Sequence, residues 1–460
     1  MTVTSSDTQV IDELTSILGL DKVAIDEGTR SRASVDEATM SPILAANLPN
    51  TIADAVVYPE EMQDVLDIVN LAVQAHTPLT PRGKGTGNYG QAVPLSGGIV
   101  IDFTRMRKIW TIEDGVITAE PGARMIELER HATSVGQQLW MYPSTVQSTL
   151  GGFIAGGSGG TGSIRHGGIP GGFVAELEVV HAVQKPEIVK VAGDDVTPYL
   201  HAYGLTGLIV GASVRLEPLQ DWSVVYGSFS TLEDTFELIQ ELPNLNPAPR
   251  LVSADESEIT SGFPKDAAIP QGRASLRAIV DSRLVGQTQH LIEAAGGMVE
   301  EVRKGLGAMV KASGLSYNHP SWFLIRKSST PLFHMEVGGK ALIESFDEMK
   351  SVYPGALIHL EGNIPEPHGM ITAPYTSKED VLQGLEQLNK LGIGFHNPHQ
   401  WYIDRNVDLL RETAIHTDPT SLLNPGHWPS RNSDPSSNVV QEKRREAMNE
   451  LSRMGNNCEN

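Results

Sequence analysis

The stretch Leu150–Gly172, LGGFIAGGSGGTGSIRHGGIPGG, decides how the rest of the chain is interpreted, because eleven of the residues in Gly151–Gly172 are glycine. Glycine loses much chain entropy on folding and forms poor helices and strands. It is useful where the backbone must approach a flat or charged group closely. A flexible linker has a similar composition but lacks apolar strand patterns on both sides. The stretch therefore predicts a large cofactor lying along this backbone.

A second glycine cluster lies upstream, at Thr77–Gly90 (TPLTPRGKGTGNYG). Both clusters contain G-x-G-x-x-G, as Gly85–Gly90 and Gly157–Gly162, but neither runs from a strand into a helix, as a nicotinamide-binding Rossmann turn requires. No G-x-x-x-x-G-K-[ST] pattern of a P-loop ATPase occurs. Backbone N–H groups that converge on a phosphate without a helix form a nest. Two separate nests suit the pyrophosphate of a dinucleotide.

Length, charge and cysteine usage narrow the class of protein. A chain of 460 residues suits two or three domains. The net charge of −21 argues against a nucleic-acid partner and against binding to anionic membranes. No signal peptide and no apolar run of about 18 residues is found, so we expect a cytoplasmic protein without stable membrane insertion. Cys458 is the only cysteine, which disfavours a disulfide, a cysteine-rich metal site and a cysteine nucleophile.

The secondary-structure pattern changes character at Pro218. Before it, short strands, helices and glycine turns alternate, with a helix expected over Asp7–Leu20 and irregular structure over Ser31–Ala45. Phe173–Val183 is expected to be a strand that pairs with Val189–Val191. Beyond Pro218, strands and helices alternate in a way that predicts a second α+β domain with an antiparallel sheet.

Seven short motifs, in order along the chain, carry a resemblance to a known family. The chain resembles the FAD-linked oxidases of the vanillyl-alcohol-oxidase and p-cresol-methylhydroxylase (PCMH) type, particularly the branch with D-lactate and glycolate dehydrogenase subunits. The motifs are Pro81–Gly87 (PRGKGTG), Ile99–Met106 (IVIDFTRM), Ala119–Ala123 (AEPGA), Ser148–Gly152 (STLGG), Arg165–Gly167 (RHG) with Leu177–Val180 (LEVV), Gly204–Val210 (GLTGLIV) and Asp418–Gly426 (DPTSLLNPG).

The resemblance implies an α+β protein in which a PCMH-type, two-lobed FAD-binding domain lies under an α+β cap domain. The expected divisions are an N-terminal helical segment at 1–48 that packs on the FAD domain, the FAD-binding domain at 49–219, the cap or substrate domain at 220–394, a C-terminal return to the FAD domain at 395–430, and a polar tail at 431–460 with a short helix near Glu442–Met454.

The resemblance also implies which residues bind FAD. The residues Arg82–Thr86 would hold the pyrophosphate, the second glycine-rich segment would line the pyrophosphate and flavin, and Asn424 would approach the flavin. The complete set is Pro81, Arg82, Gly83, Lys84, Gly85, Thr86, Gly87, Pro143, Ser144, Ser148, Thr149, Gly151, Gly152, Ala155, Gly156, Gly157, Gly159, Ser163, His166, Gly207, Ile209 and Asn424.

The chain departs from the family pattern at two points. Some relatives attach FAD through a histidine in the first loop, but the matching position here is near Thr86, so we predict non-covalent FAD. Members of the lactate and glycolate branch carry the pattern GDGNLH and a later EHG, whose histidines bind a metal. Here His359–Ile364 reads HLEGNI and no EHG occurs, so no metal site is predicted. The stretch Phe395–Trp401, FHNPHQW, stands in its place.

Candidate catalytic residues lie where the chain returns from the cap. Histidine is the usual base near neutral pH, and a base must take the proton when a flavin removes hydride from a C–H beside a hydroxyl or amine. We therefore consider His396, His399 and Tyr402 catalytic. A structural role for both histidines remains open, as does metal ligation at i, i+3 without a carboxylate ligand. Substrate contacts are predicted on cap strands and in the return, at Arg326, His334, Glu336 and Trp401.

These features predict an FAD-dependent oxidoreductase that oxidises a small alcohol or 2-hydroxy acid by hydride transfer to flavin N5. Oxygen or an electron-acceptor protein would take the electrons, and a homodimer is left open. One alternative is an oxidase of an aromatic alcohol or cyclic amine, which Trp401, Tyr402 and Trp322 favour. Another is a flavin-binding subunit of an electron-transfer complex without turnover of its own.

Overall fold

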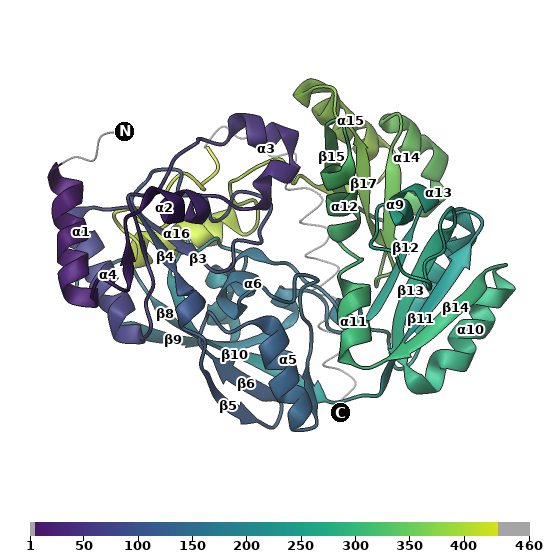
Figure 1. Ribbon diagram of the computed structural model, residues 1–460, viewed down its shortest axis with the longest axis horizontal. Coiled ribbons are helices and arrows are strands. Elements are labelled where there is room, and N and C mark those ends of the chain that lie inside the picture. The colour runs from purple at the N-terminus through teal and green to yellow at the C-terminus, as the bar shows by residue number, and fades with distance from the viewer. Residues whose placement is uncertain (1–4, 431–460) are drawn as a thin grey trace.

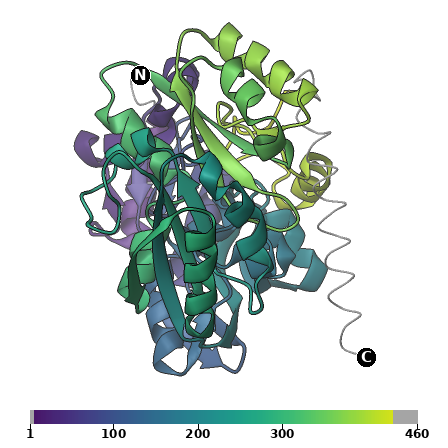
Figure 2. The same ribbon diagram turned by 90° about the vertical axis from the view of Figure 1, so that its right-hand side faces the viewer.

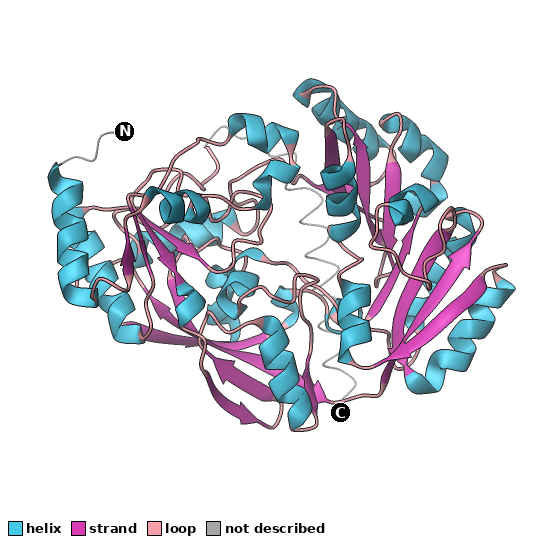
Figure 3. Ribbon diagram, viewed as in Figure 1, coloured by secondary structure: helices cyan, strands magenta, loops and turns pink. Residues whose placement is uncertain are grey.

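The computed structural model describes residues 5–430, and the tail at 431–460 with its expected helix near Glu442–Met454 lies outside them. Three β-sheets organise this part of the chain. In Figure 1 two sheets form the lobes on the left, and the third forms the cap on the right. Figure 2, turned by 90°, shows the cap in front of the two lobes. Figure 3 shows helices packed against the sheets of the lobes and of the cap, some of them between the lobes and the cap.

The first lobe is a four-stranded sheet in the order β1-β2-β4-β3. The parallel strands β2 and β4 consist almost entirely of buried aliphatic residues, as expected for a sheet covered on both faces. The amphipathic helices α1 and α4 pack together on one face through Leu14 and Ile68. The bounds are α1 (Ser5–Leu18), β1 (Val23–Ala24), β2 (Ala55–Val57), α4 (Met62–Ala75), β3 (Leu79–Arg82) and β4 (Ile99–Asp102).

The second lobe is built on the order β5-β6-β10-β8-β9, with β7 pairing with the far end of β10. The predicted pairing of the strand at 173–183 with that at 189–191 is confirmed, since β8 and β9 are antiparallel neighbours. The bounds are β5 (Ile109–Glu113), β6 (Val116–Ala119), α5 (Met125–Ser134), β7 (Gln137–Leu139), α6 (Leu150–Gly156), α7 (Ser163–His166), β8 (Val174–Val180), β9 (Ile188–Ala192) and β10 (Leu208–Pro218).

The cap is an eight-stranded sheet in the order β14-β11-β13-β12-β16-β17-β15-β18, antiparallel throughout as the sequence predicted. Its strands are β11 (Trp222–Phe229), β12 (Leu251–Asp255), β13 (Ala274–Asp281), β14 (Met298–Lys304), β15 (Leu332–Gly338), β16 (Leu357–Glu361), β17 (His368–Pro374) and β18 (Gly394–His396). The last strand therefore includes Phe395 and His396, so the chain leaves the cap sheet only after His396.

Helices cover both faces of the cap sheet. One set packs over the large apolar core that contains Phe229 and Ile358, and the other set covers a smaller core around Tyr226. Figure 1 shows α11 and α12 on the side of the cap that faces the lobes. The helices are α8 (Phe236–Glu241), α9 (Ser257–Ser261), α10 (Val285–Ala294), α11 (Leu306–Ser313), α12 (His319–Lys327), α13 (Ala341–Glu344), α14 (Phe346–Val352) and α15 (Lys378–Lys390).

Two sequence-based expectations were wrong. The segment Ser31–Ala45, expected to be irregular, lies in α2 (Glu27–Ala33), the 3-10 helix η1 (Glu37–Met40) and α3 (Pro42–Asn47). These pieces are too short for a periodic apolar pattern, and side-chain caps begin each of them. Arg326, expected on a cap strand, lies on α12 and forms a surface ion pair with Glu37.

The C-terminal segment returns to the lobes. After β18, Asp404 precedes helix α16 (Val407–Thr417), and Leu410 of that helix packs with Tyr203 of the second lobe. Further on, Leu423 forms a bridge beside Leu79 of β3. Among residues 5–430, no helix combines the length and the apolar character needed to cross a bilayer.

Candidate active site

A cleft of about 2650 Å³ lies between the two lobes and the cap. Small-molecule sites commonly occupy about 300–1,000 Å³, so this cleft has room for a large cofactor and a substrate together. The two glycine clusters line one part of it, and cap residues such as Glu336 and Glu361 line another. The C-terminal return contributes Tyr402 and Arg405.

The two glycine clusters meet along one wall of this cleft. Every residue that the resemblance assigns to FAD, with the exception of Asn424, lines it. A chain of hydroxyl groups links the clusters, because Ser148 Oγ lies 2.9 Å from Thr86 Oγ1 and 2.7 Å from Thr145 Oγ1. The backbones are packed closely, since a Cβ on Gly83 would lie 2.1 Å from Thr149 Oγ1. Only glycine allows this approach.

The donors on this wall suit a dinucleotide. Within residues 5–430, the backbone N–H groups of Lys84–Asn88 donate to no other protein group, although this loop borders the cleft. Consecutive free N–H groups in a loop form an anion-binding concavity. The Lys84 side chain is exposed at the same place. These residues fit the pyrophosphate of FAD.

Asn424 and His166, both predicted to bind FAD, form structural bonds. Asn424 does not line the cleft; its Nδ2 donates to the carbonyl oxygens of Gln91 and Tyr203 at 2.8 Å each. It thereby ties the residue that follows the first glycine cluster to the second lobe. His166 lines the cleft but stacks on Trp140 with ring centroids 4.4 Å apart, and its Nε2 lies 3.1 Å from Glu217.

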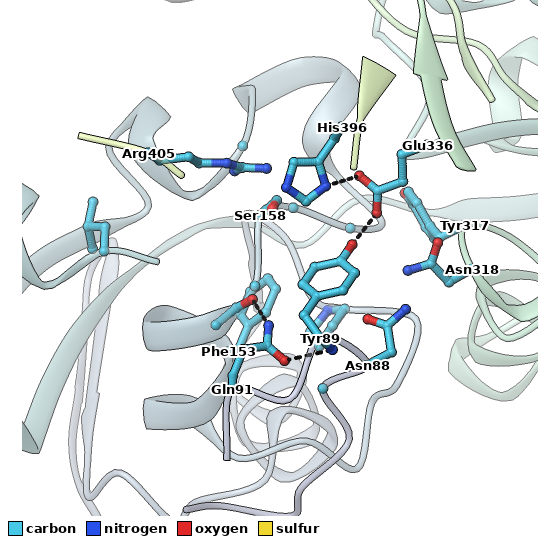
Figure 4. A pocket seen from close by; sticks show the side chains of 18 of the residues that line it. Asn88, Tyr89, Gln91, Phe153, Ser158, Tyr317, Asn318, Glu336, His396 and Arg405 are labelled. Atoms are coloured by element: carbon cyan, nitrogen blue, oxygen red, sulfur yellow. Dashed lines mark hydrogen bonds and ion pairs between the residues drawn. The ribbon is translucent and has the colours of Figure 1, made fainter. Parts of the chain in front are cut away.

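The cleft is also lined by what we call the interdomain triad, Glu336, His396 and Asp404. Figure 4 shows the first two of these side chains facing each other. His396 Nδ1 lies 3.1 Å from Glu336 Oε2, and Nε2 lies 3.0 Å from Asp404 Oδ2. Burial alone would lower the pKa of His396, but Asp404 and Glu336 outweigh it and raise this pKa to about 9. Burial raises the pKa of Glu336, and the His396 charge more than reverses this, so that the carboxylate stays ionised.

Two further residues that sequence reasoning missed border this triad. Tyr89 donates its hydroxyl to Glu336 Oε1 at 2.5 Å, and burial together with Glu336 raises the pKa of Tyr89 well above its ordinary value. Arg405 lines the cleft and forms no ion pair within the described part of the chain. Figure 4 shows its guanidinium on the opposite side of His396 from Glu336. Tyr89 lies in the first glycine cluster and Arg405 three residues beyond Tyr402, so proximity to these motifs was the available signal.

The remaining predicted residues are divided between the cleft and its surroundings. Tyr402 lines the cleft, whereas His399, His334 and Trp401 do not. His399 shares a hydrogen bond of 2.7 Å with Ser41, and burial lowers the pKa of this histidine to about 3. His334 is fully buried, 3.3 Å from Asn88 Nδ2, and burial lowers its pKa to about 4. His334 and Glu336, two positions apart on β15, both contact the first glycine cluster, through Asn88 and Tyr89, and therefore share one side of the strand.

A second group of the same kind, the cap triad, consists of Asp255, His359 and Glu361. His359 Nδ1 lies 2.8 Å from Asp255 Oδ1, and Nε2 lies 2.6 Å from Glu361 Oε1. Burial lowers the pKa of His359, but the two carboxylates outweigh it and raise this pKa to about 9. Arg277, fully buried, pairs with the other oxygen of Asp255. Among residues 5–430, no three His, Cys, Asp or Glu side chains are arranged to hold a metal ion.

Comparison with known proteins shows which kind of domain carries the glycine clusters. Residues 53–185 match the family described as an FAD binding domain. The glycolate oxidase subunit GlcD of Bacillus subtilis is 31% identical over 180 residues, which cover 36% of this chain and 38% of that protein. A D-lactate dehydrogenase of Archaeoglobus fulgidus is 30% identical over 199 residues, which cover 41% of this chain and 44% of that protein. The match thus spans about two fifths of the length of these relatives.

A solved structure of alkyldihydroxyacetonephosphate synthase shares the fold, with a TM-score of 0.72 at 16% identity over 91% of this chain and 86% of that chain. The chain therefore carries an FAD-binding domain of the PCMH type, and the resemblance stated from the sequence is confirmed. FAD is the cofactor of this domain.

Proposed function

We propose that this flavoprotein is an FAD-dependent oxidoreductase that oxidises the CH–OH group of a small 2-hydroxy acid. The observation that carries the proposal is the convergence of Tyr89, the interdomain triad and the free cation Arg405 in one cleft with the FAD-binding loops. The similarity to a glycolate oxidase subunit and a D-lactate dehydrogenase supports the same reaction class.

Bound FAD supplies an acceptor for the hydride of a C–H beside a hydroxyl group. The protein must then take the hydroxyl proton. Neither nitrogen of His396 is available to a substrate, because each faces a carboxylate. We infer a relay in which Tyr89 Oη receives the proton and passes its own to Glu336 Oε1. The Glu336 carboxyl group then rotates so that this proton faces Nδ1 of neutral His396 and delivers it there, because His396 has the highest proton affinity of the triad.

Arg405 is the binding group for the substrate carboxylate in this proposal. A guanidinium binds a carboxylate through two parallel hydrogen bonds, and among residues 5–430 no carboxylate lies within ion-pair distance of Arg405. Tyr402 lines the same end of the cleft and would help to position the substrate. The carboxylate would thus be held on one side of His396 while the hydroxyl faces Tyr89.

The experiment is an anaerobic titration of the purified holoprotein with glycolate, lactate and longer 2-hydroxy acids, following loss of the absorption of oxidised flavin. At least one acid should bleach the flavin. Arg405→Gln should raise KM about 10–100-fold, because a hydrogen bond to a charged group contributes about 1.5–3 kcal/mol. Arg283→Gln, on a cap arginine that is 77% exposed, is the matched control. No bleaching by any 2-hydroxy acid would contradict the proposal.

The attachment of FAD is proposed to be non-covalent. The loop position that carries a linking histidine in some relatives is near Thr86, and no histidine occurs between Arg82 and Gly90. Acid precipitation should therefore release the yellow colour into the supernatant. Colour that stays with the pellet would show a covalent bond and would refute this part of the proposal.

An aromatic alcohol is the second candidate substrate, because Trp322 and Phe323 line the cleft. Their rings lie edge to face with centroids 5.2 Å apart and offer a surface on which a ring can pack. Product identification over a panel of aromatic alcohols, cyclic amines and 2-hydroxy acids separates the candidates. Turnover restricted to 2-hydroxy acids would eliminate the aromatic one.

A further inference from the structure

The cap contributes a polar wall to the cleft that the proposed proton relay does not use. It is formed by Tyr317 and Asn318 in the turn before α12 with His319 at the start of that helix, and by Glu361 at the end of β16 with Asn363 just beyond it. In Figure 4, Tyr317 and Asn318 lie on the Glu336 side of His396, whereas Arg405 lies on the other side. The cleft therefore has a cationic end and a polar end, with the interdomain triad between them.

Several polar atoms of this wall form no hydrogen bond within residues 5–430. Glu361 is only 8% exposed, and its Oε1 accepts from the Tyr317 N–H at 2.7 Å and faces His359. Its Oε2 forms no hydrogen bond within the described residues. Two fully buried atoms, Asn318 Oδ1 and His319 Nδ1, also have no partner among residues 5–430. Buried polar atoms are almost always hydrogen-bonded, so these two atoms, beside the open oxygen of Glu361, indicate a ligand with several hydrogen-bonding groups.

The charge of this region is already balanced, which decides the kind of ligand. The cap triad and Arg277 together contain two carboxylates, one guanidinium and a histidine whose pKa lies at about 9. Their formal charges cancel near neutral pH. An ammonium group at Glu361 would add an unbalanced positive charge in a buried place, which is costly. Neutral hydroxyl groups, which donate and accept, match an oriented carboxylate and an amide.

We propose that this wall is a subsite for hydroxyl groups, and that the substrate is a 2-hydroxy acid with further hydroxyls along its chain, of the aldonic acid class. This rests on the proposed function for the position of the carboxylate and the reacting carbon. Glu361 Oε2 accepts a hydrogen bond from one hydroxyl, and Asn318 bonds to a second. His359 acts as a positioning residue, because it fixes the other oxygen of Glu361.

The test compares two acids of equal chain length, D-gluconate and 2-hydroxyhexanoate, which differ in the hydroxyls beyond C2. They are titrated anaerobically into dithionite-reduced holoprotein by calorimetry, so that binding is measured without turnover. We expect gluconate to bind at least about tenfold more tightly, as one or two additional buried hydrogen bonds provide. Glu361→Gln and Asn318→Ala, with FAD content as the check on folding, should each reduce that ratio to below about threefold.

Glu344→Gln changes an exposed carboxylate on α13, outside the cleft, and is the matched control that should keep the ratio. Equal affinity of the wild-type protein for the two acids would overturn the subsite, as would a ratio unchanged in both cleft variants. Failure of the proposed function gives a different result. The oxidised flavin would then be bleached by neither acid, while the ratio of the two affinities would still test the subsite.

Discussion

The molecule contains the same arrangement twice, a histidine between two carboxylates, and the two copies are built differently. The cap triad lies within one sheet: Asp255 on β12 pairs in register with His359 on β16, and both histidine contacts are hydrogen bonds of 2.8 Å and 2.6 Å. The interdomain triad takes Glu336 from β15 and His396 from the neighbouring edge strand β18, but Asp404 from the segment that packs on the lobes. Its contacts are longer, at 3.1 Å and 3.0 Å.

This difference shows that the charges around the histidine and the place of the triad in the fold determine separate properties of such a site. Both histidines have a pKa raised to about 9, because two carboxylates outweigh burial in each case. Only the interdomain triad includes a carboxylate with a substantially exposed side chain, Glu336 at 29%, together with a tyrosine from the other domain. The same local electrostatics therefore supports a rigid binding wall in one place and a proton path in the other.

The sharpest way to separate the two triads is to change each histidine. His396→Gln should lower kcat/KM about 10²–10⁴-fold with FAD still bound, since it removes the final proton acceptor. His359→Gln should act mainly through KM, because it disturbs only the orientation of Glu361. Steady-state kinetics and flavin absorbance check both variants. Equal losses of kcat would show that the two triads do not differ in function.

For the stability of the fold, we expect the cap triad to matter more than the interdomain triad. Arg277 is fully buried against Asp255, so Arg277→Ala leaves an uncompensated carboxylate in the cap and should cost about 3–5 kcal/mol. Arg283→Ala, on the surface of the same domain, should change stability by less than about 0.5 kcal/mol. Denaturant unfolding measures both. A small effect of Arg277→Ala would mean that the cap triad does not stabilise the cap sheet.

The pH dependence should move activity and stability in opposite directions. The proton relay needs neutral His396, so kcat/KM should rise about tenfold per pH unit from pH 7 until it levels near pH 9. The folded-state pKa of both histidines lies above their ordinary value of 6.5, so their contribution to stability is complete below pH 6.5 and is lost as the pH rises through 9. Activity that falls between pH 7 and 9 would indicate that the protonated histidine is required.

A change beside a third histidine, His399, should have the smallest effect and serves as a reference for both triads. In the described part of the chain His399 has no carboxylate partner, and Ser41, its neighbour, also caps α3 by accepting from the Leu44 N–H at 3.0 Å. Ser41→Ala should therefore lower stability by about 1 kcal/mol. The pH profile of activity should stay in place, because His399 does not line the cleft. Thermal unfolding and the pH profile of kcat/KM check this, and a displaced profile would assign His399 to the proton path.

Much of the cleft wall that carries the glycine clusters could be predicted because its signals are local. Gly83 and Thr149 belong to short motifs whose backbone geometry depends on glycine, and such motifs are visible in the sequence without knowledge of the fold. The antiparallel cap sheet was visible from strand spacing in the same way. The exception is Asn424, whose side chain proved to be used for joining Gln91 to Tyr203.

The candidate catalytic groups depended on the tertiary structure. His396 and His399 are three residues apart in a segment with no regular period, so the sequence treats them alike. The packing of the return segment brings Asp404 to His396, which raises the pKa of His396. The same packing buries His399 beside Ser41, and this burial lowers the pKa of His399. Tyr89 meets Glu336 across 247 positions of sequence. The sequence by itself determined the cofactor wall, because glycine acts on its own backbone; the proton path was decided only by folding, because electrostatic shifts depend on which distant charges become neighbours.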